Sequence, residues 1–219
     1  MKKIFIASII LSCLMTDFAL AKTEKFSGPS ILLGLSSVGS NSKISGDYET
    51  LNSTGNNSQS ITTGASYLHS INNDWLIGAG VGYDFGNSKS ESKGFVGNGD
   101  ILRISNKEHL SIYLQPTYAI NDNVALFGKI GYHRSKVIVS NITNEFYESL
   151  LYSDNIHGIG GGLGLIASLN KNIFLKLEIE YVDYQTKNIQ YAILKILEPV
   201  SNRYKLTTTA GIFSLGYRF

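Results

Sequence analysis

Apolar and polar residues alternate along most of the chain after residue 27, and this pattern predicts β-strands. From Trp75 to Phe85, every second residue is apolar, whereas the positions between them are mainly glycine. Three short turns rich in Asn and Asp interrupt the alternation about 49 residues apart, at 71–74, 120–123 and 169–172. Each turn joins two alternating segments, so the sequence predicts a regular array of antiparallel hairpins.

This alternation predicts eight strands in total. They lie near residues 28–40, 58–70, 75–87, 108–119, 124–136, 155–168, 173–185 and 203–219. Such strands have about 10–14 residues, which is enough for the ~9–11 that cross a bilayer when tilted. The connections 41–57, 88–107, 137–154 and 186–202 are longer than the three turns, and we expect them as loops on the opposite side of the membrane.

The two faces of these strands differ in a way that favours a membrane protein. The apolar face is continuous, whereas the other face is rich in glycine and carries regularly spaced ionisable residues. A soluble sandwich, the alternative, would bury the apolar face in a core. We therefore predict an all-β fold, an eight-stranded antiparallel up-and-down transmembrane β-barrel whose apolar face meets lipid. Closure also leaves no unpaired strand edge in the bilayer.

The N-terminus has the features of a cleaved signal peptide. Lys2 and Lys3 precede an apolar run of about 12 residues, and Ala19-Leu20-Ala21 offers a small-residue cleavage site. The run is too short for a membrane-spanning helix. The prediction is a signal peptide at 1–21 and an outer-membrane β-barrel domain at 22–219; a lipoprotein cleaved at Cys13 is the alternative.

Composition excludes several functions. Removing Lys2, Lys3 and Asp17 lowers 19 basic and 17 acidic residues to 17 and 16, and this balance gives no indication of nucleic-acid binding. The only cysteine, Cys13, lies in the predicted signal, so the mature chain has no disulfide or thiolate site. No His/carboxylate spacing recurs, and we expect no metal and no cofactor.

The inner face predicts a lumen, the interior of the barrel, that is closed by its own side chains, as expected for eight strands. Pairing the strands about Lys171 places Gly164 opposite Glu178 and Gly162 opposite Glu180. The glycines at 158, 160, 162 and 164 have no side chains and leave room for the charged side chains of the neighbouring strands. We expect these charges to be paired, because an unpaired buried charge would cost several kcal/mol. This lumen charge cluster comprises Lys129, Lys176, Glu178 and Glu180, and the lumen glycines are Gly158, Gly160, Gly162 and Gly164. A plug without a transport role is the favoured interpretation, and a path for protons or small ions is the alternative.

The end of the chain places large apolar residues at every second position, at Phe213, Leu215, Tyr217 and Phe219. With this ending and eight predicted strands, the chain resembles the small eight-stranded outer-membrane barrels, namely the OmpA transmembrane domain and the OmpX-like and opacity-type barrels of the porin family. The resemblance implies a bacterial outer-membrane location, recognition of the C-terminus by the assembly machinery, and contact with outer-membrane lipid and lipopolysaccharide. Members serve in adhesion, serum resistance and envelope integrity.

One group of residues resembles the His-x-Ser…Glu arrangement of the lipid A deacylases, which are also eight-stranded barrels. Its members are His133 as base, Ser135 as nucleophile, and Glu145 as the residue that orients the imidazole. Lys136 replaces the asparagine that usually follows the serine, and His133 and Ser135 are expected to face the lumen rather than lipid. We therefore expect no enzymatic activity.

The last long connection has an unusual apolar pattern. Its apolar residues recur at helical spacing before Pro199, at Ile189, Ala192, Ile193, Ile196 and Leu197. They either pack on the barrel or form a patch that binds a host-surface ligand or the outer leaflet. The prediction is a monomeric, non-enzymatic surface protein whose outer loops mediate adhesion or maintain the envelope. A small-solute porin-like channel and a lipid A deacylase-type hydrolase are the alternatives.

Overall fold

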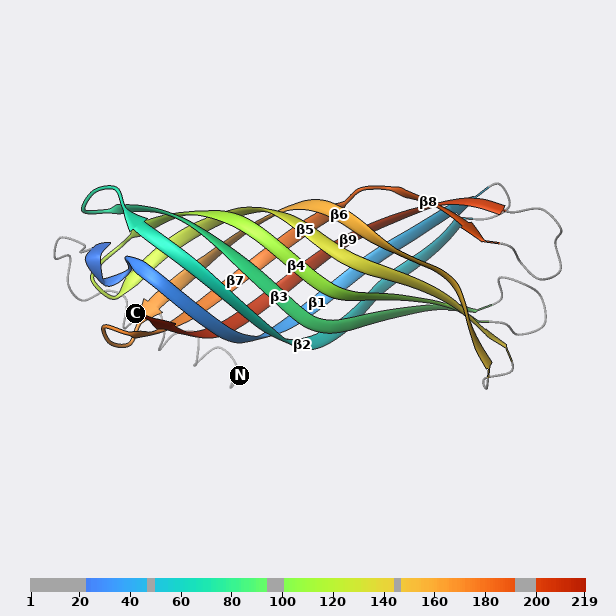
Figure 1. Cartoon of the computed structure of the whole chain (residues 1–219), viewed down its shortest axis with the longest axis horizontal. Coiled ribbons are helices and arrows are strands. Elements are labelled where there is room, and N and C mark those ends of the chain that lie inside the picture. The colour runs from blue at the N-terminus through green and yellow to red at the C-terminus, as the bar shows by residue number, and fades with distance from the viewer. Residues whose placement is uncertain (1–22, 47–49, 94–100, 144–146, 192–199) are drawn as a thin grey trace, which may run out of the picture.

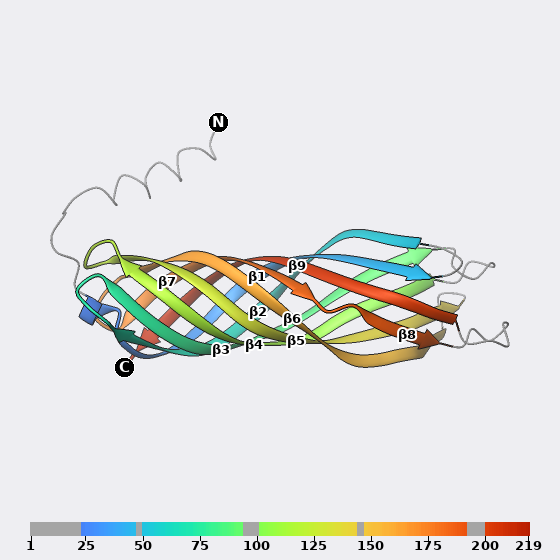
Figure 2. The ribbon, with the colours of Figure 1, turned by 90° about the horizontal axis from the view of Figure 1, so that it is seen from above.

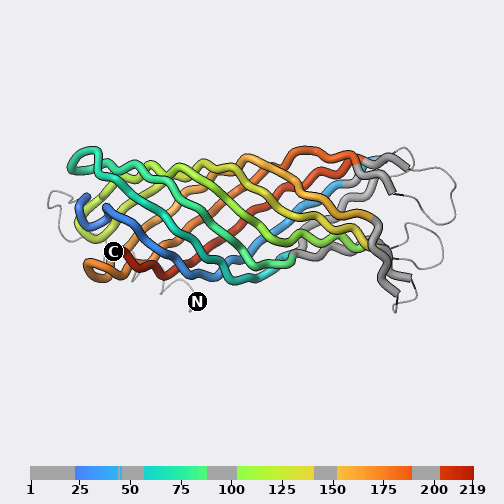
Figure 3. The backbone as a smooth tube through the Cα atoms, viewed as in Figure 1, coloured from blue at the N-terminus to red at the C-terminus, as the bar shows by residue number. Residues whose placement is uncertain are grey.

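A computed structural model describes residues 23–46, 50–93, 101–143, 147–191 and 200–219, and its strands form one elongated barrel (Figures 1 and 3). A short 3-10 helix, η1, covers Thr23–Lys25. The strands are β1 (Gly28–Gly46), β2 (Thr50–Ser70), β3 (Trp75–Lys93), β4 (Ile101–Ala119), β5 (Val124–Thr143), β6 (Tyr147–Ser168), β7 (Ile173–Tyr184), β8 (Lys187–Tyr191) and β9 (Val200–Arg218). In the described part of the chain, no helix is long and apolar enough to cross a membrane.

The barrel is closed and antiparallel, as predicted. Strands β1 to β7 pair in chain order, β7 pairs with β9, and β9 returns to pair with β1. Strand β8 occupies no separate position in the barrel, because β7 and β8 pair with successive parts of β9. Asp183 of β7 lies opposite Thr207, and Lys187 of β8 lies opposite Tyr204. The nine strands therefore fill eight barrel positions, one of which is interrupted at residues 185–186.

The strands are longer than predicted. The prediction that 41–57, 88–107 and 137–154 form loops was wrong for most of their residues, which lie in strands. Strands β1 to β6 and β9 each have 19–22 residues, so most of 41–57, 88–107 and 137–154 belongs to the barrel wall. Segments 41–57 and 88–107 are rich in Ser, Asn and Lys, because they extend beyond the predicted bilayer region into water. Without a lipid face they lack the apolar–polar contrast that reveals a strand in the sequence.

The helical spacing expected at 189–197 was also wrong where the structure describes it. Ile189 lies in strand β8 and pairs with Asn202 of β9. Backbone pairing with an existing strand satisfies the amide groups there and overrides a short apolar repeat. Ala192, Ile193, Ile196 and Leu197 lie outside the described residues.

The three Asn/Asp turns share one hydrogen-bond pattern. The Oδ1 atoms of Asn72, Asn121 and Asn170 each accept hydrogen bonds from the backbone amides two and three residues later. Asparagine recurs at this position because its side chain satisfies the amides that a tight turn leaves unpaired. The turns and the C-terminus lie at the same end of the barrel, whereas β8 lies at the other end (Figures 1 and 2).

The outer wall is apolar around the middle of the barrel. Its large exposed side chains include Leu33, Ile112, Ile130, Ile159, Leu163 and Ile179. At the turn end, the ring centroids of Trp75 and Tyr118 lie 5.1 Å apart, and both side chains are exposed. Exposed Tyr132 and Tyr181 lie farther along the strands, at the other edge of this apolar band. A band bordered by aromatic residues is the expected lipid face of a transmembrane barrel.

Beyond this band, β8 is tied to β6 by an ion pair. Lys187 Nζ lies 2.5 Å from Asp154 Oδ2, and the hydroxyl of Tyr152 donates to the same carboxylate oxygen at 2.9 Å. The hydrogen bond from Lys187 lowers the pKa of Asp154 to about 2. The carboxylate therefore stays charged at neutral pH and holds the interrupted strand against its neighbour.

Candidate functional site: the closed lumen

The turn end of the lumen is closed by an apolar cluster. Its buried members are Phe26, Leu68, Leu76, Ala119, Ala125, Phe127, Ile166 and Phe174. Phe26 is fully buried and is held by η1, whose Lys25 carbonyl accepts a hydrogen bond from the Arg218 guanidinium. The guanidinium carbon of Arg218 lies 4.7 Å from the ring centroid of Phe174. The segment before β1 thus seals the turn end of the barrel.

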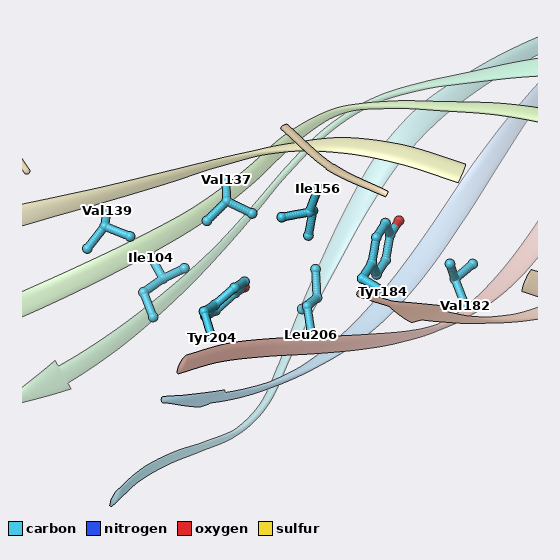
Figure 4. Packing of buried hydrophobic residues seen from close by; sticks show 8 residues of the cluster. All are labelled: Ile104, Val137, Val139, Ile156, Val182, Tyr184, Tyr204 and Leu206. Atoms are coloured by element: carbon cyan, nitrogen blue, oxygen red, sulfur yellow. The ribbon is translucent and has the colours of Figure 1, made fainter. Parts of the chain in front are cut away.

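A second apolar cluster fills the lumen toward the opposite end (Figure 4). It consists of Ile104, Val137, Val139, Ile156, Val182, Tyr184, Tyr204 and Leu206, contributed by β4, β5, β6, β7 and β9. The Tyr204 hydroxyl donates to Asn106 Oδ1 at 3.3 Å, so the polar group of this large buried side chain has a partner. The sequence analysis did not predict this cluster. Apolar clusters therefore lie on both sides of the polar middle layer of the lumen.

The middle layer contains the charge cluster derived from the sequence. Lys129 Nζ lies 2.8 Å from Glu178 Oε1 and also contacts Glu180 Oε2. Lys176 Nζ lies 3.2 Å from Glu178 Oε2 and donates to Gln115 Oε1 at 3.0 Å. These four charged side chains are at most 7% exposed. Each buried charge has an opposite partner, which offsets the cost of removing it from water.

Aromatic rings of neighbouring strands complete the surroundings of the two lysines. Lys129 Nζ lies 4.4 Å from the ring centroid of Tyr113, and Lys176 Nζ lies 4.3 Å from that of Phe127. A ring face attracts a cation most strongly where water is excluded.

The lumen glycines provide the space for this layer. Gly162 pairs with Glu180 and Gly164 with Glu178, the register expected from the turn. A Cβ atom on Gly162 would lie only 2.8 Å from the Ile179 carbonyl oxygen, and one on Gly160 would lie 2.6 Å from His133 Nε2. Strand β6 therefore carries glycine where its neighbours carry long side chains.

A pair of imidazoles adjoins the charge cluster. The rings of His109 and His133 are parallel within 4°, with His109 Nε2 2.9 Å from His133 Nδ1. Glu180 Oε1 lies 3.8 Å from the same His133 nitrogen. His109 lies within the register shift between Lys107 and Leu110, next to Glu108, which has a φ of 53°.

The opposite side of this layer is lined by small polar residues. Ser36 Oγ donates to Asp84 Oδ2 at 2.5 Å, and the Ser60 hydroxyl donates to Oδ1 of the same carboxylate. Because strands β1 to β3 carry mainly Ser, Thr and Gly inside, a cavity of about 100 Å³ remains beside the long side chains of the other strands. His109, Asp84, Lys129 and Glu180 line it.

The residues of the deacylase alternative do not form a catalytic pair. His133 and Ser135 both face the lumen and are buried, as strand parity predicted. Ser135 Oγ donates to the Lys107 carbonyl at 3.1 Å, while the Nδ1 atom of His133 faces His109. Glu145 lies outside the described residues. Within the described strands, this geometry gives the serine no base.

The residues of the expected assembly signal lie on the outer wall. Phe213, Leu215, Tyr217 and Phe219 are 44–70% exposed along β9 and at the residue that follows it. They alternate with inward residues such as Ser214 and Arg218, which are buried. This outward apolar face of β9 is accessible to lipid or to another protein.

Comparison with known proteins places the chain in an established structural group. Residues 5–219 match the family model described as "Outer membrane protein beta-barrel domain". No protein of curated function matches at the sequence level.

Two solved structures, OprG and AlkL, have a similar fold. The outer membrane protein OprG from Pseudomonas aeruginosa is similar, with a TM-score of 0.58 at 14% identity over 88% of this chain and 96% of that one. The outer membrane protein AlkL, determined in lipid bilayers, gives a TM-score of 0.53 at 16% identity, over 93% and 94% of the two chains. Ail of Yersinia pestis gives 0.46 at 18% identity over 88% and 99%.

Proposed function

The chain belongs to the outer membrane protein β-barrel family and lies in the bacterial outer membrane, and from that premise we propose that it is a non-enzymatic surface protein with a plugged lumen. Its role is adhesion to a host surface or maintenance of the envelope, carried by the part of the barrel beyond the outer leaflet. The observation that carries the proposal is the lumen itself. Two apolar clusters enclose a fully paired charge cluster, which leaves the outer end as the accessible surface.

The length of the strands supports this assignment of the outer end. Strand β6 continues from Ile159, on the apolar band, for 12 residues to Tyr147, and the paired part of β5 continues with it to Thr143. At a strand rise of about 3.3 Å per residue, a paired wall of this length extends well beyond the headgroups. A rigid wall that projects from the membrane is a suitable scaffold for the four outer connections.

Lipopolysaccharide is the partner expected at the base of this wall. Lys43 of β1 lies directly opposite Lys205 of β9, and both side chains are exposed. Arg203 lies two residues closer to the outer end of β9, on the same exposed face. Like charges directly opposite in a sheet are unfavourable unless an anion lies between them. Phosphate groups of the outer leaflet supply such anions, and Asp183 neutralises Lys205 only in part, at 3.5 Å.

The surface role is tested by shortening the last outer connection. Replacing residues 192–199 with a short glycine-rich turn should reduce adhesion of expressing bacteria to host cells or matrix at least several-fold, because these residues join the outer ends of β8 and β9. The measurement is the number of adherent cells, or survival in detergent for an envelope role. Unchanged adhesion and survival, with normal amounts of folded barrel, would reject the proposed function.

The closed lumen makes a separate prediction against the channel alternative. The mature chain in planar bilayers should give no conductance steps above those of the lipid alone, because water-excluding clusters fill both sides of the middle layer. Purified porin from the same preparation procedure serves as the positive control. Reproducible steps that disappear when the protein is heat-denatured would favour the channel.

A further inference from the structure

The imidazole pair and its carboxylate lie where three strands meet inside the barrel. His109 comes from β4, His133 from β5 and Glu180 from β7, and each side chain offers one ligand atom within 4.8 Å of the other two. His133 is fully buried and Glu180 is 4% exposed. The pair adjoins the charge cluster through Glu180, whose Oε1 lies 3.8 Å from His133 Nδ1.

A hydrogen bond between the two rings satisfies only part of this arrangement. One proton can be shared between His109 Nε2 and His133 Nδ1 across 2.9 Å, but Glu180 Oε1 stays 3.8 Å from the ring nitrogen, beyond hydrogen-bond distance. Three electron-pair donors thus lie around one point, and a single proton can bond to two of them at most. A metal cation at that point could be coordinated by all three.

We propose that His109, His133 and Glu180 form a binding site for a divalent transition-metal ion of the Zn²⁺ type. Two imidazoles and one carboxylate are the donor set that such ions take in sites with an open position. With metal–ligand bonds of about 2.1 Å, ligand atoms on one tetrahedral ion lie roughly 3.4 Å apart. Two of the present separations, 2.9 and 3.8 Å, lie on either side of that value, and all three ligand atoms lie within 4.8 Å of one another. Side-chain movements of about 1 Å therefore bring them onto one ion.

The surroundings favour a bound ion in three respects. Lys129 holds Oε2 of Glu180 and thereby directs Oε1 toward the imidazoles. A Cβ atom on Gly131 or Gly160 would lie 3.2 or 2.6 Å from His133 Nε2, so these glycines leave the space that the ring occupies. The cavity of about 100 Å³, lined by His109 and Glu180, leaves room for a water molecule as the fourth ligand.

Charge in this layer is compatible with a dication. Asp84 of β3 lies directly opposite His109 in the β3–β4 register and lines the same cavity. The carboxylates of Glu178 and Glu180 face the two ammonium groups of Lys129 and Lys176. Asp84 therefore provides a further negative charge close to the ion.

The test uses the full mature chain without a polyhistidine tag, refolded in detergent micelles and freed of metal with a chelator. Titration with Zn²⁺ in a calorimeter should give one equivalent bound. His109→Gln and Glu180→Gln should each weaken binding at least about 10- to 100-fold, because each removes a ligand. His69→Gln and His157→Gln, which change histidines elsewhere on the barrel, should bind as the wild type does.

A spectroscopic signature separates ligation from an indirect effect on folding. Cu²⁺ bound to the wild type should show electron paramagnetic resonance coupling to two imidazole nitrogens, and His109→Gln, if folded by gel mobility, should show at most one. Absence of stoichiometric binding to the wild type would overturn the proposal. So would full binding by folded His109→Gln, or equal losses in the His69→Gln and His157→Gln controls.

Discussion

Replacing Lys129 with methionine should lower the free energy of unfolding by about 3–5 kcal/mol, the cost of removing one partner from a buried charge cluster. Lys129 contacts both Glu178 and Glu180, and its side chain is 7% exposed. Without it, Glu178 keeps its ion pair with Lys176, whereas Glu180 loses its direct contact with an ammonium group and keeps the imidazole of His133 at 3.8 Å. Urea titration of the barrel in lipid vesicles measures the loss through the fluorescence of Trp75, the single tryptophan, which is exposed on the wall.

Two further variants separate the buried charge from the loss of any lysine. Lys171→Met changes an exposed lysine in the last Asn turn and should leave the unfolding midpoint unchanged. Lys129→Met combined with Glu180→Gln should be more stable than Lys129→Met alone, because the double variant no longer buries an unpaired carboxylate. Equal stability of Lys129→Met and Lys171→Met would mean that the cluster contributes nothing to folding.

The charge cluster could be located from the sequence because the turns repeat. Asn72, Asn121 and Asn170 occupy equivalent turn positions, so counting residues from each turn gives the depth of a side chain in the lumen. That count placed Gly162 opposite Glu180, which the register confirms. Side-chain direction follows with the same certainty, because strand periodicity is two and a closed barrel allows no slip. Near the turns, the sequence therefore determined both the fold and the contacts.

Farther from the turns, the same count fails for physical reasons. The bulge at Glu108 shifts the register of β4, so counting from the turn gives the inward direction of His109 but not that of Ile104 and Asn106 beyond the bulge. The imidazole pair joins residues 24 apart, and Glu180 lies on another strand; no local motif marks such a group. The second apolar cluster of the lumen was not predicted, because Val137 and Tyr204 lie at the limits of the predicted strands. Bulges and long polar walls depend on tertiary pairing, which the local pattern does not encode.

Replacing Gly162 with valine should prevent normal assembly of the barrel. A Cβ atom there would lie 2.8 Å from the Ile179 carbonyl oxygen of the paired strand and 3.5 Å from Glu178 Oε1. The backbone oxygen cannot move without breaking the β6–β7 ladder, and the two branches of valine would displace the carboxylates from Lys129. Overpacking alone costs about 1–3 kcal/mol, and separation of the charge cluster adds to it. The measurement is the fraction of protein that migrates as the compact, heat-sensitive form on a gel after refolding.

The adjacent residue provides a matched control with the opposite expected sign. Gly161 is exposed on the outer wall, and a Cβ atom there would meet only the Lys129 carbonyl oxygen, at 3.4 Å. Gly161→Val should therefore refold at least as well as the wild type, because valine favours the strand conformation and adds apolar surface toward lipid. Both substitutions replace glycine with valine in the same strand, so they change the strand propensity equally. A difference in assembly between the two variants therefore arises from the packing of the Gly162 position in the lumen. Equal assembly of both variants would show that β6 has room for side chains inside, and that its glycines are not required by the charge cluster.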